Sequence, residues 1–120
     1  MKAHPAGAGW EELAEAHLRE RGLELLERNY HCRLGEIDLI MRDGPVIVFV
    51  EVRYRADQRY GGALETVDRR KQLKIQRAAG IFLSRQSRLA CQPCRFDIIG
   101  IEGAPGHPTI RWLRDAFEAA

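Results

Sequence analysis

Residues 35–55 read GEIDLIMRDGPVIVFVEVRYR, two apolar runs separated by an Asp-Gly pair. Apolar runs on either side of Asp-Gly predict a β-hairpin, with strands over residues 35–41 and 46–54. The second run is apolar on both faces from Val46 to Val52, which is typical of a strand in the middle of a sheet that is covered on both sides. We therefore expect an α/β fold in which helices pack on both faces of a mixed β-sheet.

The rest of the chain supplies the helices and three more strands. Apolar residues recur at spacings of three and four over residues 9–21 and again over residues 64–84, which predicts two helices. Shorter strand patterns occupy residues 23–30, 95–101 and 109–113. The predicted order is α-β-β-β-α-β-β, in a single domain over residues 9–120 that follows a flexible segment over residues 1–8.

The composition is typical of a globular protein. Of the 120 residues 45% are hydrophobic and 30% are charged, and the formal net charge is +2. The longest apolar run, residues 45–50, is too short to cross a bilayer, and the N-terminus lacks the apolar core of a signal peptide. We therefore expect a cytoplasmic protein without a membrane partner, whose thiols stay reduced. Cys91 and Cys94 form a CxxC pair, but no second ligand pair accompanies them, which favours ordinary thiols over a zinc or redox site.

The predicted hairpin carries three carboxylates and a guanidinium, and their placement depends on the register. With Asp43 and Gly44 as the central turn residues, Asp38 faces Phe49. The acidic residues of both strands then share one face, which holds Glu36, Asp38, Glu51 and Arg53. Asp38 and Glu51 become diagonal neighbours with Cα atoms about 7–8 Å apart. Two interpretations stay open: an ion-pair cluster within the sheet, or a site for a hard divalent cation, which takes oxygen ligands from one or two carboxylates.

One residue on each helix bears on these alternatives. Glu11 shares a flank of the first helix with Ala14 and Leu18, at the edge of its buried face. It is either a solvated edge residue or a neighbour of the acidic face of the sheet. Lys71 falls in the middle of the apolar stripe of the second helix. It either extends its ammonium to water or reaches the acidic face of the sheet, or a phosphate held there.

A basic patch follows the carboxylate strand. Between residues 53 and 77 there are eight Lys or Arg residues against three Asp or Glu, which gives +5 in this segment. Tyr54 and Tyr60 lie among these arginines. Cations along a groove with interspersed aromatic rings suit a phosphate backbone and unstacked bases, although a solvated helix face is the alternative. We favour nucleic acid, and the expected backbone contacts are Arg55, Arg59, Arg70, Lys74 and Arg77.

Several motifs together resemble a known family. They are WEELA at 10–14, ERN at 27–29, GEIDLI at 35–40, VFVEVRYR at 48–55, Lys71, RFDII at 95–99 and DAF at 115–117. In this order and spacing they resemble the YraN-like family, small bacterial proteins of the PD-(D/E)XK nuclease superfamily. The resemblance implies a restriction-endonuclease-like core and a Mg²⁺- or Mn²⁺-dependent endonuclease that cleaves phosphodiester bonds in DNA, with branched and single-stranded DNA as candidate substrates.

The resemblance also implies roles for single residues. Asp38 matches the aspartate of the second core strand, and Glu51 matches the acidic residue of the (D/E)xK signature, so both are expected to ligate the metal. Glu11 matches a first-helix glutamate that archaeal Holliday-junction resolvases also carry, and would ligate the metal directly or through water. Lys71 matches a lysine on the helix after the site. Glu36 belongs to the GEID motif and supports either the metal or the fold.

Arg53 stands where the signature has lysine. Arginine can donate a forked pair of hydrogen bonds to phosphate oxygens, but it does not serve as a base near neutral pH because it stays protonated. Two functions therefore remain open: an endonuclease in which Arg53 and Lys71 stabilise the transition state, or a non-catalytic nucleic-acid-binding module that retains the nuclease fold. A protein adaptor is a third option, and a homodimer is open by analogy with other nucleases of this fold.

Overall fold

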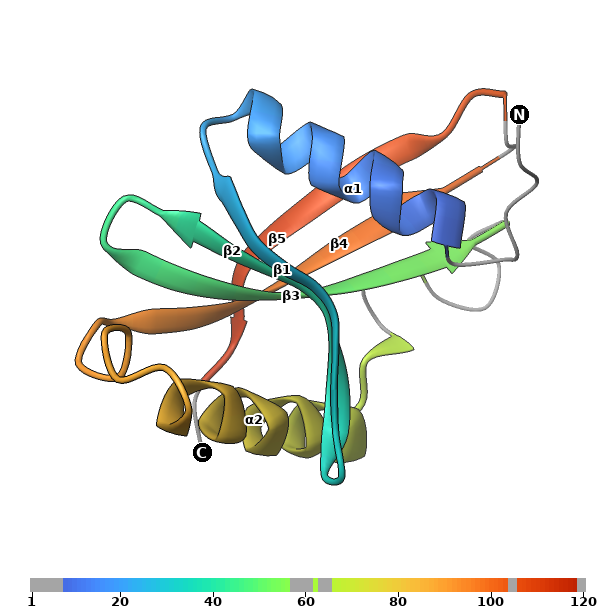
Figure 1. Ribbon diagram of the computed structural model, residues 1–120. Coiled ribbons are helices and arrows are strands. Elements are labelled where there is room, and N and C mark those ends of the chain that lie inside the picture. Colours follow the sequence, from blue (N-terminus) through green and yellow to red (C-terminus); the bar gives the residue numbers. More distant parts are fainter. Residues whose placement is uncertain (1–7, 57–61, 63–65, 104–105, 119–120) are drawn as a thin grey trace.

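The computed structural model describes residues 8–56, 62, 66–103 and 106–118. Its elements are α1 (Ala8–Glu20), β1 (Glu24–Cys32), β2 (Gly35–Asp43), β3 (Val46–Arg55), α2 (Arg69–Ser84), β4 (Cys94–Glu102) and β5 (Thr109–Phe117). The strands form one sheet in the order β1-β2-β3-β4-β5, antiparallel except for the parallel β3–β4 pair. Figure 1 shows α1 over one face of this sheet and α2 over the other. The predicted order of elements is confirmed, and this mixed α/β architecture is consistent with a restriction-endonuclease-like fold.

Strand β3 lies in the middle of the sheet, as its apolar sequence predicts. Val48 and Val50 belong to the buried cluster under α1, and Ile47 and Phe49 belong to the cluster under α2. The Phe49 ring stacks on Phe96 with a centroid distance of 5.4 Å. Burying a side chain of this kind stabilises the fold by about 1.5–3 kcal/mol, so β3 is the strand that both layers hold in place.

The hairpin turn differs from the prediction. Gly44 and Pro45 are its central residues, because Asp43 still pairs with Val46. Gly44 has φ +59°, and glycine is the residue that a type II′ hairpin turn takes at its first central position. An ion pair to Arg95, 3.0 Å from Nη2 to Oδ2, also holds Asp43 within the strand. The predicted Asp43-Gly44 turn is therefore wrong by one residue.

This turn shifts the register of the hairpin by two residues. Ile40, and not Asp38, is the partner of Phe49. A shift of two keeps each side chain on the same face wherever the strands remain paired, whereas a shift of one would have reversed the faces. The pairing of β2 with β3 runs only as far as Leu39 and Val50.

Strands β1 and β2 then leave the sheet together as a bent ribbon, which Figure 1 shows running from the centre of the sheet to the side of α2. At the bend Asn29 has φ +50°. Asn29 lies between two residues of β1 that pair with β2, since Arg28 pairs with Leu39 and Tyr30 pairs with Ile37. Asparagine tolerates this left-handed backbone better than most residues. The bend separates β2 from β3 at Asp38.

The second helix begins later than predicted. It starts at Arg69, and Asp68 is its N-cap, whose side chain accepts a hydrogen bond from the Lys71 backbone N–H at 2.9 Å. The predicted residues 64 and 65 lie outside the described part of the chain, and residues 66–68 are not α-helical. The predicted flexible segment also lies outside it, except for Ala8, at which α1 begins. Neither of the described helices is long and apolar enough to span a bilayer.

Candidate active site

The candidate site lies where β2 and β3 separate. Beyond the Leu39–Val50 pair, the Asp38 side chain takes the place of a strand partner, because the Val52 backbone N–H donates to Asp38 Oδ2 at 2.8 Å. This hydrogen bond holds the carboxylate against β3. The diagonal arrangement of Asp38 and Glu51 that a regular hairpin predicts is therefore not formed. The contact between Asp38 and the Val52 N–H replaces it where the strands separate.

Glu51 follows on β3 and faces α2. Its side chain is only 3% exposed, and Oε2 lies 3.3 Å from Arg53 Nη1 and 3.6 Å from Lys71 Nζ. Burial and the neighbouring charge of Asp38 raise the pKa of Glu51 to about 8, although Lys71 and Arg53 act in the opposite direction. Two cations therefore do not compensate fully for the buried negative charge.

Glu11 comes from the first turn of α1, on the other side of the sheet. It is half-buried, and burial raises its pKa to about 7, with further contributions from Asp38 and Glu36. A hydrogen bond with Asp38 raises the pKa of Glu11 and that of Glu51 alike. Asp38 therefore lies between the other two carboxylates. The structure thus brings together Glu11 from α1, Asp38 from β2 and Glu51 from β3, and we call these three residues the acidic group.

Two cations border this acidic group. Lys71 extends from α2 to Glu51. Of its two predicted placements, in water or at the acidic face of the sheet, the structure shows the second. Arg53 is held by its neighbours: Nε donates to Thr66 Oγ1 at 2.7 Å, Nη2 donates to the Thr66 carbonyl at 3.3 Å, and Nη1 donates to Glu51. The guanidinium thus joins β3 to the segment before α2, and its orientation is fixed.

The residues predicted to contact a nucleic-acid backbone lie at the surface around the site. Arg55 is exposed at the end of β3, and Arg59 lies outside the described residues, as does Tyr60. On α2 three exposed cations follow the predicted spacing, Arg70, Lys74 and Arg77. Tyr54 was predicted to serve with these cations, but its ring stacks on Trp10 at 4.2 Å with an interplanar angle of 6°. That prediction is wrong, because the Tyr54 ring packs β3 against α1.

Comparison with known proteins places the chain in a family. The sequence model of the uncharacterised protein family UPF0102 matches residues 10–101. The chain belongs to family UPF0102. It is 51% identical over 119 residues to the UPF0102 protein of Stutzerimonas stutzeri, with 98% of each chain covered. It is also 50% identical over 113 residues to that of Xanthomonas euvesicatoria, which covers 94% of this chain and 91% of the relative. For Nitrosococcus oceani the identity is 50% over 107 residues, with 89% and 86% covered.

The UPF0102 match includes every residue of the acidic group and both cations beside it. Within the described residues, no group of three or more His, Cys, Asp or Glu side chains is arranged so that it could hold a metal ion as it stands. The donor set nevertheless fits Mg²⁺ or Mn²⁺, since these ions prefer carboxylate oxygens and need only one or two of them beside water. The raised pKa values of Glu11 and Glu51 also indicate an excess of negative charge that such an ion would neutralise.

Sequence reasoning missed the contacts that position the site in this UPF0102 protein. Arg28 donates two hydrogen bonds to Glu15, from Nε at 2.6 Å and from Nη2 at 2.9 Å. This pair joins α1 to β1 next to the bend at Asn29, one helical turn from Glu11. A cleft of about 820 Å³ between α1 and β1 adjoins it. The one available signal was the arginine in the ERN motif, whereas nothing singled out Thr66.

The two cysteines of the CxxC motif lie apart from this acidic group. Both are exposed free thiols. Cys91 lies in the turn that precedes β4, and Cys94 is the first residue of β4. Partial burial raises the pKa of the Cys94 thiol, which disfavours the thiolate that metal binding or redox chemistry requires.

Proposed function

We propose that this UPF0102 protein is a metal-dependent endonuclease of the PD-(D/E)XK superfamily that cleaves phosphodiester bonds in DNA. The observation that carries the proposal is the convergence of Glu11, Asp38 and Glu51 where β2 leaves β3, with Lys71 beside them. Burial and mutual repulsion raise two of their pKa values. An ion-pair cluster that served only the fold would balance its charges, whereas strongly perturbed carboxylates are typical of functional sites.

Asp38 and Glu51 would hold Mg²⁺ or Mn²⁺, and Glu11 would ligate the ion directly or through water. When bound, the ion would supply Lewis-acid polarisation of the phosphate and a lowered pKa for a coordinated water. The Val52 N–H already orients Asp38 through Oδ2, and the two cations contact Glu51 through the same oxygen, Oε2. The opposite oxygen of each carboxylate is the ligand atom that these contacts favour.

The chain's own cations would stabilise the phosphate during the reaction. Lys71 is close enough to Glu51, at 3.6 Å, for its ammonium to approach a phosphate oxygen at the acidic group. A positive charge fixed there stabilises the negative charge that develops on the transferring phosphate. Arg53 adds a second fixed charge, and its contacts with Thr66 keep it beside Glu51. Arginine side chains do not act as bases near neutral pH, so the proposal gives Arg53 no role in accepting a proton from the attacking water.

The exposed cations around the site would bind the DNA backbone. These are Arg55, Arg70, Lys74 and Arg77 among the described residues, together with Arg59. Neutralising backbone phosphates gives binding that weakens steeply with salt and reads no sequence. Branched and single-stranded DNA are the proposed substrates, and these cations would hold them independently of the metal.

The experiment that tests the proposal compares wild type with Glu51→Gln and Asp38→Asn. Labelled four-way junction, flap, single-stranded and duplex DNA are incubated with Mn²⁺ at low salt. We expect both variants to lose cleavage while binding to DNA in EDTA persists, because each substitution removes a metal ligand and leaves the basic surface intact. Arg88→Ala, an exposed cation after α2, is the control and should cleave as wild type does. Equal cleavage by wild type and both variants would refute the proposal.

A second candidate function is a nucleic-acid-binding module without turnover. The observation that favours it is that Arg53, at the position of the signature lysine, already donates hydrogen bonds to Thr66 and Glu51. Such a module would bind DNA in a salt-dependent manner with no effect of metal. Wild-type DNA binding without any Mn²⁺-dependent cleavage would support this function over the first.

A further inference from the structure

The tip of the β1–β2 ribbon forms a basic notch with α2. A cavity of about 380 Å³ lies between them. The ionisable side chains that line it are Arg33, His31 and Glu36 from the tip and Lys71 and Lys74 from α2. His31 and Glu36 face each other, with Nδ1 and Oε2 3.0 Å apart. The remaining three side chains are cationic, so the notch carries an excess of positive charge suited to an anion.

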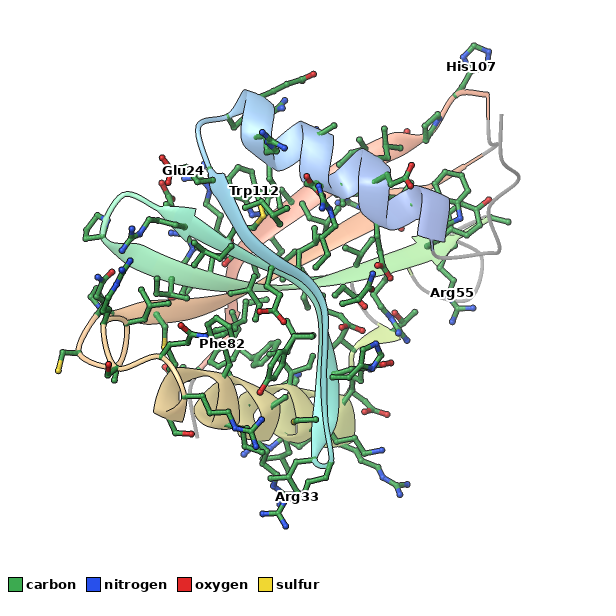
Figure 2. All side chains as sticks on the ribbon, in the orientation of Figure 1. Glu24, Arg33, Arg55, Phe82, His107 and Trp112 are labelled. Atoms are coloured by element: carbon green, nitrogen blue, oxygen red, sulfur yellow. The ribbon has the colours of Figure 1, made fainter. Side chains whose placement is uncertain are left out.

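The tip is seated directly on the helix backbone. A Cβ atom added to Gly35 would lie 2.9 Å from the Lys74 carbonyl oxygen, so only glycine permits this approach. Cys32 closes the turn by donating from Sγ to the Gly35 carbonyl at 3.4 Å. Figure 2 shows Arg33 at the end of the ribbon beside α2. The seating of Gly35 therefore fixes where Arg33 stands relative to Lys74.

The notch adjoins the candidate active site through one residue. Lys71 lines the notch and also lies 3.6 Å from Glu51. An anion in the notch would therefore lie next to one at the acidic group, on the same side of the sheet as α2. Successive phosphates of one nucleic-acid strand provide anions at such neighbouring positions.

We propose that this notch binds a backbone phosphate of the DNA strand, adjacent to the phosphate that is cleaved. Arg33 and Lys74 provide the charge contacts, and Gly35 allows the tip to close on α2. The inference rests on the proposed function for the identity of the ligand, and it adds the ribbon tip to a surface that otherwise consists of β3 and α2. The tip thereby fixes the direction in which the strand leaves the active site.

The test measures DNA binding without metal. The affinity for short fluorescein-labelled single-stranded and duplex DNA is measured in EDTA at salt concentrations from about 50 to 200 mM. We expect Arg33→Ala to weaken binding and to reduce the slope of log K against log salt by about 0.7–0.9, the value of one lost phosphate contact. The double variant Arg33→Ala/Lys74→Ala should lose about twice that slope. Thermal melting of each variant verifies that it is folded.

Arg88→Ala is the matched control, because it removes an exposed arginine from the segment after α2, outside the notch. It should keep the wild-type slope. If Arg33→Ala and Arg88→Ala show the same slope, the notch proposal is overturned.

The outcome is independent of the endonuclease test. If Glu51→Gln abolishes cleavage but Arg33→Ala binds as the control does, the endonuclease proposal stands and the notch proposal fails. If Arg33→Ala lowers the slope but wild type does not cleave any substrate, the notch stands as a nucleic-acid site and the endonuclease proposal fails.

Discussion

Replacing Glu51 by glutamine is predicted to stabilise the metal-free protein at neutral and alkaline pH. The Glu51 side chain is 3% exposed, and burial with the charge of Asp38 raises its pKa from 4.5 to about 8. Above pH 4.5 the unfolded chain therefore releases this proton before the folded protein does. The free energy of unfolding of wild type should fall by about 1.4 kcal/mol per pH unit until the pH passes the folded value. Glutamine has no such proton, so the variant lacks this decline.

The size of the effect follows from that slope. From pH 5 to pH 8, one proton accounts for at most about 4 kcal/mol. Relaxation and water penetration reduce the cost of a buried charge in real proteins, so we expect Glu51→Gln to exceed wild type by about 1–3 kcal/mol at pH 8. The raised pKa of Glu11 produces a decline of the same sign in both proteins, since its causes are burial, Asp38 and Glu36. The difference between the two proteins therefore reports on Glu51.

The assay is urea denaturation in EDTA at several pH values from pH 5 to pH 8. The control is Glu24→Gln, which removes an exposed carboxylate at the start of β1 (Figure 2) and should follow the pH dependence of wild type. The difference between Glu51→Gln and wild type should grow with pH. Parallel pH profiles for these two proteins, or a Glu51→Gln variant that is less stable than wild type at pH 8, would refute the reasoning.

Three further predictions concern the metal, the lysine and the sheet. Saturating Mn²⁺ should raise the melting temperature of wild type and leave that of Glu51→Gln unchanged, since a ligand at about 100 times its Kd stabilises a fold by about 2.7 kcal/mol; an equal rise in both would place the ion elsewhere. Lys71→Met should slow Mn²⁺-dependent cleavage by about 10²–10³-fold in single-turnover assays, and a rate close to wild type would exclude the ammonium from the reaction. Asp97→Ala should lower the free energy of unfolding by about 3–5 kcal/mol in urea denaturation. The reason is that Asp97 is fully buried and accepts hydrogen bonds from Arg95, Trp112 and the Asp115 backbone. A loss below about 1 kcal/mol would contradict the expectation that these hydrogen bonds stabilise the sheet.

The sequence predicted the layers of the fold because hydrophobic burial leaves a periodic record. The apolar run in β3 indicated a central strand, and both helices cover it. Local turn chemistry was less decisive, since Asp43-Gly44 and Gly44-Pro45 are both plausible turns and only the strand contacts decide between them. The start of α2 was also misjudged: Asp68 is a good N-cap residue, but the apolar spacing continued across it.

The candidate site was partly readable from the sequence. A register error of two residues left Glu51 on the predicted face, so the pattern of alternation was sufficient for it. The separation of β2 from β3 was not predictable, because it depends on the bend at Asn29 and on the Asp38 side chain bonding to the Val52 N–H. The role of Tyr54 was misread for a related reason, since only the placement of α1 brings Trp10 onto its ring.

The central claim is that one divalent ion binds among the carboxylates of α1, β2 and β3. The most direct measurement is anomalous diffraction from crystals soaked in Mn²⁺, for wild type and for Glu51→Gln. We predict a single peak between Asp38 and Glu51 in wild type and none at that position in the variant. Wild-type crystals at saturating Mn²⁺ that show no peak there, with Glu51 still bound to Lys71 and Arg53, would contradict the account.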